Sequence, residues 1–158
     1  MNADSVTDMT SKALPSVLIV DDSAALRGAL RAVLGALGVT RIAEAANAMD
    51  AINVLRSGEI SLTITDWKME PMDGLTLLKS IREGAVGPNR SIPVIMLTAY
   101  NDPRYQAEAL RAGASVFLSK PFTAASLVDA LDAVQATRSP ITAPQTGSAP
   151  TARAAAQA

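Results

Sequence analysis

Residues 17–23 read Val-Leu-Ile-Val-Asp-Asp-Ser, a short apolar run that ends in two aspartates and a serine. Four adjacent branched aliphatic side chains are typical of a strand that is buried on both faces. Leucines and a valine at helical spacing follow over positions 26–37, and Gly38 ends that stripe. The stretch therefore predicts a buried strand followed directly by a helix.

The same alternation continues along the chain. Further strands are predicted at 40–44, 60–65, 92–97 and 115–119. Helices are predicted to begin near Asn47, Asp73, Pro103 and Thr123. Five strand–helix units in succession require a parallel sheet with helices on both faces and right-handed crossovers. We therefore predict an α/β fold built on a doubly wound, five-stranded parallel sheet.

The composition excludes several classes of protein. The 158 residues include no cysteine and no histidine, and the formal net charge is −1. Without cysteine there can be neither a disulfide framework nor a thiolate zinc site. Without histidine the chain lacks the commonest general base and cannot serve as a phosphohistidine carrier. The near-zero charge gives no electrostatic basis for binding nucleic acid, so no direct contact with DNA is expected.

Unpatterned segments flank the alternating region. Residues 1–15 are polar, and residues 138–158 are dominated by alanine, proline, threonine and serine. Such segments cannot bury enough apolar surface to offset the entropy of ordering them. We expect a disordered lead at 1–15, one folded domain at 16–137 and a disordered tail at 138–158. The first fifteen residues contain no apolar stretch typical of a signal peptide, and no apolar run reaches about 18 residues, so we expect no signal peptide and a cytoplasmic protein without membrane contact.

The candidate site residues stand where the predicted strands end. In a doubly wound sheet, ligands bind beyond the carboxyl ends of the strands. The residues at those ends are Asp21, Asp22, Asp66, Thr98 and Lys120. Taken singly, each has an ordinary explanation as a helix cap, a turn residue, a strand-end threonine or a solvated lysine. Together, three carboxylates, a hydroxyl and an ammonium at one sheet edge indicate a site for a charged group.

These five side chains suffice for phosphoryl transfer. Carboxylates about 4 Å apart repel by roughly 1 kcal/mol in water and about 4 kcal/mol at an effective dielectric of 20. A cation relieves this repulsion, and Mg²⁺ prefers oxygen ligands shared between carboxylates and phosphate. Asp66 stands alone at its strand end and is the natural acceptor, which leaves Asp21 and Asp22 for the metal. The groups of Lys120 and Thr98 can balance the charge of the transferred phosphoryl group.

The motifs themselves resemble a known family. They are V-L-I-V-D-D-S (17–23), D-W-K-M-E-P-M-D-G (66–74), L-T-A (97–99) and L-S-K-P-F (118–122). In this order they are similar to the receiver domain of bacterial two-component response regulators. The resemblance implies a flavodoxin-like (βα)5 fold with strand order 2-1-3-4-5, an order typical of chemotaxis receivers.

The resemblance also implies roles at the phosphorylation site. Asp66 resembles the phosphoacceptor, and Asp21 and Asp22 resemble the magnesium-binding pair. The backbone carbonyl of Lys68 would be a further ligand of the metal. Lys120 resembles the lysine that pairs with the phosphoryl group.

Other positions resemble the parts of the family's switch. Thr98 resembles the switch hydroxyl, and Ala99 is the small residue that leaves room for the phosphoryl group. Phe117 lies where the rotating switch aromatic is found. The Lys120–Pro121 bond resembles the family's usual cis peptide.

The chain also departs from the family pattern. Glu70 separates Met69 from Pro71, a spacing that changes the loop after the acceptor. Phe117 replaces a frequent tyrosine, so its ring has no hydroxyl to hydrogen-bond. Tyr100 and Lys68 flank the expected opening of the site. Tyr100 has two open interpretations, a cover that excludes water or a loop aromatic without a role.

The resemblance implies a single-domain response regulator. It would take a phosphoryl group from a sensor histidine kinase or a histidine phosphotransferase and act through a protein target or a phosphorelay. No output domain is predicted after residue 137, and the downstream target is unknown. The protein would not be an enzyme apart from Mg²⁺-dependent self-phosphorylation and slow autodephosphorylation.

Three other classes of protein share part of this pattern. A dehalogenase-type phosphatase needs Asp-x-Asp after its first strand, whereas Asp21 and Asp22 are adjacent. A flavin-binding protein of related topology needs a phosphate loop where these two carboxylates would repel phosphate. A receiver-like module that signals without phosphorylation would not need the complete set of site residues.

Overall fold

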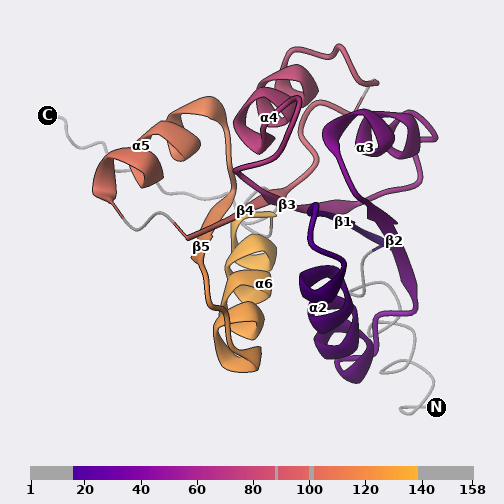
Figure 1. Cartoon of the computed structure of the whole chain (residues 1–158), viewed down its shortest axis with the longest axis vertical. Coiled ribbons are helices and arrows are strands. Elements are labelled where there is room, and N and C mark those ends of the chain that lie inside the picture. Colours follow the sequence, from indigo (N-terminus) through magenta and orange to yellow (C-terminus); the bar gives the residue numbers. More distant parts are fainter. Residues whose placement is uncertain (1–15, 88, 100–101, 139–158) are drawn as a thin grey trace, which may run out of the picture. The chain divides into compact units, whose positions relative to one another are not determined.

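The computed structural model describes residues 16–87, 89–99 and 102–138. The expected disordered lead and all of the expected tail beyond Arg138 lie outside these residues, as does Tyr100. The described chain alternates strictly between strands and helices (Figure 1). The strands are β1 (Ser16–Val20), β2 (Arg41–Ala45), β3 (Leu62–Asp66), β4 (Val94–Thr98) and β5 (Val116–Ser119). The helices are α2 (Ala24–Ala36), α3 (Ala48–Leu55), α4 (Gly74–Arg82), α5 (Pro103–Ala112) and α6 (Ala124–Arg138).

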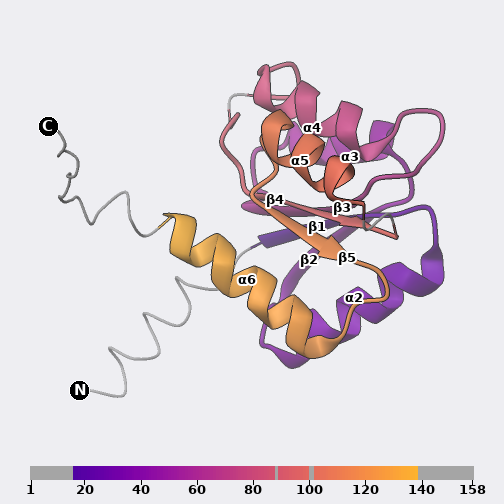
Figure 2. The same ribbon diagram turned by 90° about the vertical axis from the view of Figure 1, so that its left-hand side faces the viewer.

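The five strands form one parallel sheet in the order β2-β1-β3-β4-β5. This confirms the predicted fold class and strand order. The chain divides into two compact units between Pro121 and Phe122. In the first unit, α2 covers one face of the sheet, and α3, α4 and α5 cover the other (Figure 2).

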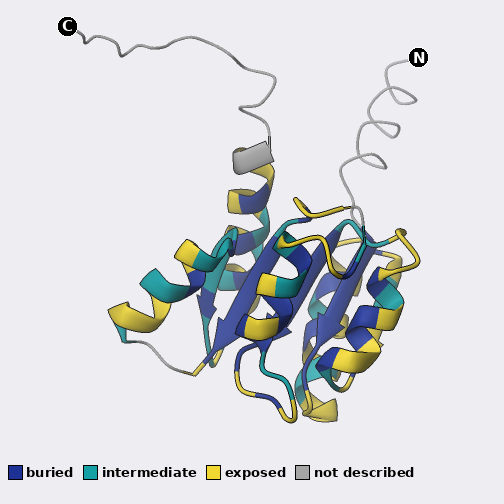
Figure 3. Ribbon diagram, turned by 90° about the horizontal axis from the view of Figure 1, so that it is seen from above, coloured by how far each residue is buried: buried dark blue, intermediate teal, exposed yellow. Residues whose placement is uncertain are grey.

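The core of the first unit lies along the central strands. Every residue of β1, β3 and β4 is buried, whereas the edge strands β2 and β5 are partly exposed (Figure 3). Helices on both faces leave these strands without a solvent-facing side, which explains their continuous apolar runs. The buried strands therefore hold their carboxyl ends in fixed positions relative to one another.

Side-chain caps begin the helices where the sequence predicts. The side chains of Ser23, Asn47 and Asp73 accept hydrogen bonds from amides in the first turns of α2, α3 and α4. In the second unit, Thr123 and Ser126 exchange hydrogen bonds of 2.8 and 3.0 Å between amide and hydroxyl, so the predicted cap of α6 is confirmed. These caps satisfy amides that have no partner within the helix.

Strand boundaries differ slightly from the predicted ones. The strand predicted at 92–97 begins at Val94, because Pro93 has no amide hydrogen to give to a neighbouring strand. The carbonyl of Pro93 still accepts a hydrogen bond of 3.0 Å from the amide of Thr63. The strand predicted at 60–65 begins at Leu62 and includes Asp66 as its last residue. The acceptor predicted from the sequence is thus part of the strand itself.

Replacing Thr63 by valine is expected to stabilise the protein. The Thr63 hydroxyl is fully buried and has no hydrogen-bond partner within the described part of the chain. A valine of similar shape removes this unsatisfied group, which we expect to add about 1 kcal/mol to the free energy of unfolding. The melting temperature should then rise by about 4 °C.

The control for this substitution is Thr65→Val. Thr65 is equally buried, but its hydroxyl donates a hydrogen bond of 3.0 Å to the Asp66 carbonyl. Its loss should lower the melting temperature measured in the same thermal denaturation experiment. A lower melting temperature for Thr63→Val as well would contradict the assignment of an unsatisfied hydroxyl.

Candidate functional site

The sheet brings the five predicted site residues to one edge. Asp21 and Asp22 directly follow β1, Asp66 and Thr98 end β3 and β4, and Lys120 directly follows β5. Because β1, β3, β4 and β5 are neighbours and all parallel, their carboxyl ends line up side by side. The site thus assembles from segments that are far apart in the sequence.

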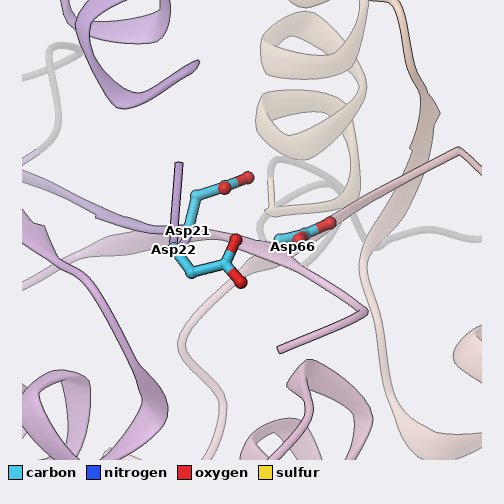
Figure 4. Close-up of side chains that lie close together, drawn as sticks. All are labelled: Asp21, Asp22 and Asp66. Atoms are coloured by element: carbon cyan, nitrogen blue, oxygen red, sulfur yellow. The ribbon is translucent and has the colours of Figure 1, made fainter. Parts of the chain in front are cut away.

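Three carboxylates form the centre of this site. Each of Asp21, Asp22 and Asp66 places a carboxylate oxygen within 4.8 Å of the other two (Figure 4). Asp21 and Asp66 are buried, with 1% and 5% of their surface exposed, whereas Asp22 is exposed. A cluster of oxygen ligands with one open side fits a hard divalent cation that keeps several of its waters.

Lys120 joins two of these carboxylates. Its Nζ lies 3.0 Å from Asp66 Oδ1 and 3.3 Å from Asp21 Oδ2. Burial by itself lowers the pKa of Lys120, but the hydrogen bonds and charges of Asp66 and Asp21 outweigh it, and the pKa is raised. The ammonium therefore stays charged and partly neutralises the cluster.

The Asp66 carboxyl lies in an environment that disfavours its charge. Burial is the largest cause and raises its pKa, and the charges of Asp21 and Asp22 raise it further. The hydrogen bond from Lys120 acts in the opposite direction without reversing the shift. One ammonium is therefore insufficient for three carboxylates, which favours the binding of a further cation.

Backbone hydrogen bonds hold the ends of the site strands. The amide of Trp67 donates to the Leu97 carbonyl at 3.1 Å, and the amide of Lys120 donates to the Thr98 carbonyl at 2.7 Å. The Lys120–Pro121 bond is cis, as predicted. Glu70–Pro71, in the loop with the altered spacing, is also cis, which the sequence did not predict.

The other predicted site residues differ in how far they are buried. Thr98 is buried with 1% of its surface exposed, and Ala99 after it is exposed. Lys68 is exposed in the loop after Asp66. Phe117 is partly buried against the hydrophobic core. The position of Tyr100, the fifth of these residues, is not among those described.

The sequence did not point to two residues that contact the site segments. Tyr105, in the first turn of α5, packs edge-on against Trp67 with ring centroids 5.4 Å apart and an interplanar angle of 86°. Arg27 of α2 donates a hydrogen bond to the backbone carbonyl of Asp21. No local sequence signal identifies either contact, because each depends on which side chains of a helix face the sheet edge.

Comparison with known proteins identifies the family of this chain. The family model described as Response regulator receiver domain matches residues 17–132. The chain belongs to this family. It is therefore a receiver domain of two-component signalling.

The receiver is similar to bacterial chemotaxis proteins. It is 37% identical to chemotaxis protein CheY-3 of Vibrio cholerae over 118 residues, which cover 75% of this chain and 89% of the relative. It is 36% identical to chemotaxis protein CheY of Pseudomonas aeruginosa, with 75% and 94% covered.

Solved structures of receivers have the same fold. Chemotaxis protein CheY4 of Vibrio cholerae matches with a TM-score of 0.69 and 28% identity, over 77% of this chain and 98% of that one. A putative response regulator from Chloroflexus aurantiacus matches with a TM-score of 0.71 and 29% identity, over 78% and 98%. Separately, none of the helices in the described ranges is long and apolar enough to cross a membrane.

Proposed function

We propose that this receiver accepts a phosphoryl group on Asp66 from the phosphohistidine of a sensor histidine kinase or a histidine phosphotransferase. The observation that carries the proposal is the cluster of Asp21, Asp22 and Asp66 with Lys120 bound to two of its members. A carboxylate nucleophile, a fixed ammonium and a cation site are the groups that phosphoryl transfer to an aspartate requires.

Asp66 is the acceptor in this proposal. One of its carboxylate oxygens forms a bond to phosphorus while the bond between phosphorus and the histidine nitrogen of the donor breaks. The Lys120 ammonium, 3.0 Å from Asp66 Oδ1, lies where it can balance the negative charge of the transferred group. The Thr98 hydroxyl is assigned the same task from the end of the neighbouring strand β4, and exposed Ala99 leaves room for the group.

Mg²⁺ is the proposed cofactor. Asp21, Asp22 and Asp66 would hold it, together with the backbone carbonyl of Lys68. When bound, the ion neutralises the carboxylates and the phosphoryl oxygens that approach them. The three carboxylates fit this ion, because the cluster provides hard oxygen ligands and too little positive charge of its own.

Output is proposed to pass through a protein contact or a phosphorelay. Thr98 and Phe117 would form the switch that couples the phosphorylated site to a surface for the downstream target. Neither direct DNA binding nor catalysis on an external substrate belongs to the proposal, apart from self-phosphorylation and slow autodephosphorylation. Lys68 is proposed to flank the opening of the phosphorylation site. The protein is proposed to be cytoplasmic.

Incubation with acetyl phosphate and Mg²⁺ tests this function. We expect one phosphoryl group per chain, detected by intact mass, that is stable in acid and labile in base. Asp66→Asn should not be labelled, because an amide cannot replace the carboxylate nucleophile. Asp50→Asn, which changes an exposed carboxylate on α3, should be labelled as the wild type is. Stoichiometric labelling of Asp66→Asn would disprove the assignment of the acceptor.

A further inference from the structure

The backbone of Asp21 is held on both sides. Its amide donates to the Ala45 carbonyl of β2 at 3.1 Å, and its own carbonyl accepts a hydrogen bond of 2.6 Å from Arg27 Nη1. The Arg27 side chain is only 17% exposed, so water competes weakly for this contact. This hydrogen bond lies where β1 ends and the chain turns toward α2.

The next residue, Asp22, depends on this arrangement. Its carboxylate is exposed and makes no hydrogen bond within the described residues, and its backbone is spanned by a hydrogen bond of 2.8 Å from the Ser23 amide to Asp21 Oδ1. The Asp21 carbonyl, the Asp22 amide and the Asp22 Cα lie in one planar peptide group. A hydrogen bond that fixes the direction of the carbonyl therefore fixes the plane from which the Asp22 side chain departs.

Glu44 in turn holds Arg27 in place. Its Oε1 accepts a hydrogen bond of 2.9 Å from Arg27 Nε, and its Oε2 accepts one of 2.7 Å from Arg31 Nε. Arg31 is one turn further along α2, and its second contact is with the Ile42 carbonyl, away from the site. The two arginines thus share one partner, but only Arg27 also contacts the backbone of Asp21.

We propose that Arg27 is a positioning residue for magnesium binding, which acts by orienting the Asp21–Asp22 peptide so that the Asp22 carboxylate faces Asp21 and Asp66. The inference rests on the proposed function, since it concerns the metal of that site. Residues that orient metal ligands commonly change metal affinity when they are substituted, although they do not touch the metal.

The sign of the effect separates positioning from simple electrostatics. Arg27 carries a positive charge near the carboxylates, so removing that charge would by itself strengthen the binding of a cation. Loss of the orientation of the Asp21–Asp22 peptide would instead weaken the binding of the cation. A weaker affinity in a variant without the guanidinium therefore cannot arise from the change in charge.

Arg27→Met and Arg31→Met form a matched pair for the test. Each keeps an unbranched stem and removes one of the two guanidinium groups bound to Glu44, but only Arg27→Met also frees the Asp21 carbonyl. The metal-free full-length chain is titrated with MgCl₂ and followed by the fluorescence of Trp67, which is the only tryptophan and directly follows Asp66. Thermal unfolding in EDTA shows that each variant is folded at the titration temperature.

We expect Arg27→Met to weaken magnesium affinity by about tenfold, in line with other residues that orient metal ligands. Arg31→Met should bind Mg²⁺ as the wild type does. Phosphorylation of Arg27→Met by acetyl phosphate should be slow at low Mg²⁺ and return to the wild-type rate at saturating Mg²⁺. Arg27→Lys, which restores a cation with a single donor nitrogen, should recover part of the lost affinity.

Wild-type affinity in Arg27→Met, or equal losses in Arg27→Met and Arg31→Met, would overturn the proposal. If Arg27→Met does not fold, the proposal is judged on Arg27→Lys, and unchanged affinity in that variant would overturn it. Failure of the wild type itself to bind Mg²⁺ would instead disprove the proposed function, so the two failures are distinguishable.

Discussion

Replacement of Gly74 by alanine is expected to destabilise the protein strongly and to abolish phosphorylation of Asp66. A Cβ atom on Gly74 would overlap the Asp66 carbonyl oxygen and would lie 3.0 Å from the Asp66 carbonyl carbon and 3.1 Å from the Trp67 Cα. All three are backbone atoms, so no flexible side chain can move aside. The Gly74 amide also donates to the Trp67 carbonyl at 2.8 Å, which ties α4 to the end of β3.

The cost follows from these backbone contacts. Overpacking of a well-packed interior commonly costs 1–3 kcal/mol, and we expect about 3 kcal/mol here because the backbone must shift. The melting temperature should fall by about 10 °C. The strand end that carries Asp66 would move with that shift, so labelling by acetyl phosphate should be lost even where the variant is folded.

Gly28→Ala is the control for this prediction. Gly28 lies within α2, and a Cβ added there would meet no atom within 4 Å. Because alanine favours the helix over glycine by up to about 1 kcal/mol, this variant should be as stable as the wild type or more stable. Thermal denaturation of the three proteins provides the measurement. A Gly74→Ala protein that melts with the wild type and is labelled normally would contradict the predicted overlap.

Much of the fold could be predicted because the local signals agree with one another. The apolar runs that predicted strands belong to β1, β3 and β4, which are buried throughout. Predicted caps such as Asn47 and Asp73 begin their helices as expected. Since parallel strands end at one sheet edge, the grouping of Asp21, Asp66 and Lys120 also followed from their positions after the strands.

The contacts that tune the site could not be predicted in this way. Lys120 binds both Asp66 and Asp21, but the position of its side chain between the two carboxylates cannot be predicted from the sequence. Arg27 and Tyr105 contact the site segments from helices. Which helix side chains make such contacts depends on the rotation of each helix against the sheet. Such contacts come from tertiary packing and leave no periodic signal in the sequence.

The charge on Asp66 is expected to make the metal-free protein less stable than Asp66→Asn near neutral pH. Burial, followed by the charges of Asp21 and Asp22, raises the pKa of Asp66 above its ordinary value of 3.8 despite the hydrogen bond from Lys120. A carboxyl with a raised pKa in the folded state binds its proton more tightly there than in the unfolded chain. Its stabilising contribution is complete below the ordinary pKa and is lost as the pH rises through the folded-state pKa.

In EDTA near neutral pH, Asp66→Asn should therefore exceed the wild type in stability by an amount on the order of 1 kcal/mol, since relief of repulsion is partly offset by loss of the Lys120 ion pair. The difference should shrink as the pH falls toward the ordinary aspartate range, where the wild-type carboxyl is protonated. Thermal unfolding across this pH range measures it. Asp132→Asn, which changes an exposed carboxylate on α6 and leaves the Asp66 carboxylate in place, is the control variant.

Mg²⁺ should make the wild type more stable than Asp66→Asn, the reverse of the order expected in EDTA. A ligand at 100 times its dissociation constant stabilises the folded state by about 2.7 kcal/mol, and this gain depends on the carboxylates that bind it. The wild type should therefore gain several degrees in melting temperature on addition of Mg²⁺, whereas Asp66→Asn should gain much less because one of its three carboxylates is absent. Equal gains in both proteins, or a metal-free Asp66→Asn that melts below the wild type near neutral pH, would show that charge crowding at Asp66 does not control this site.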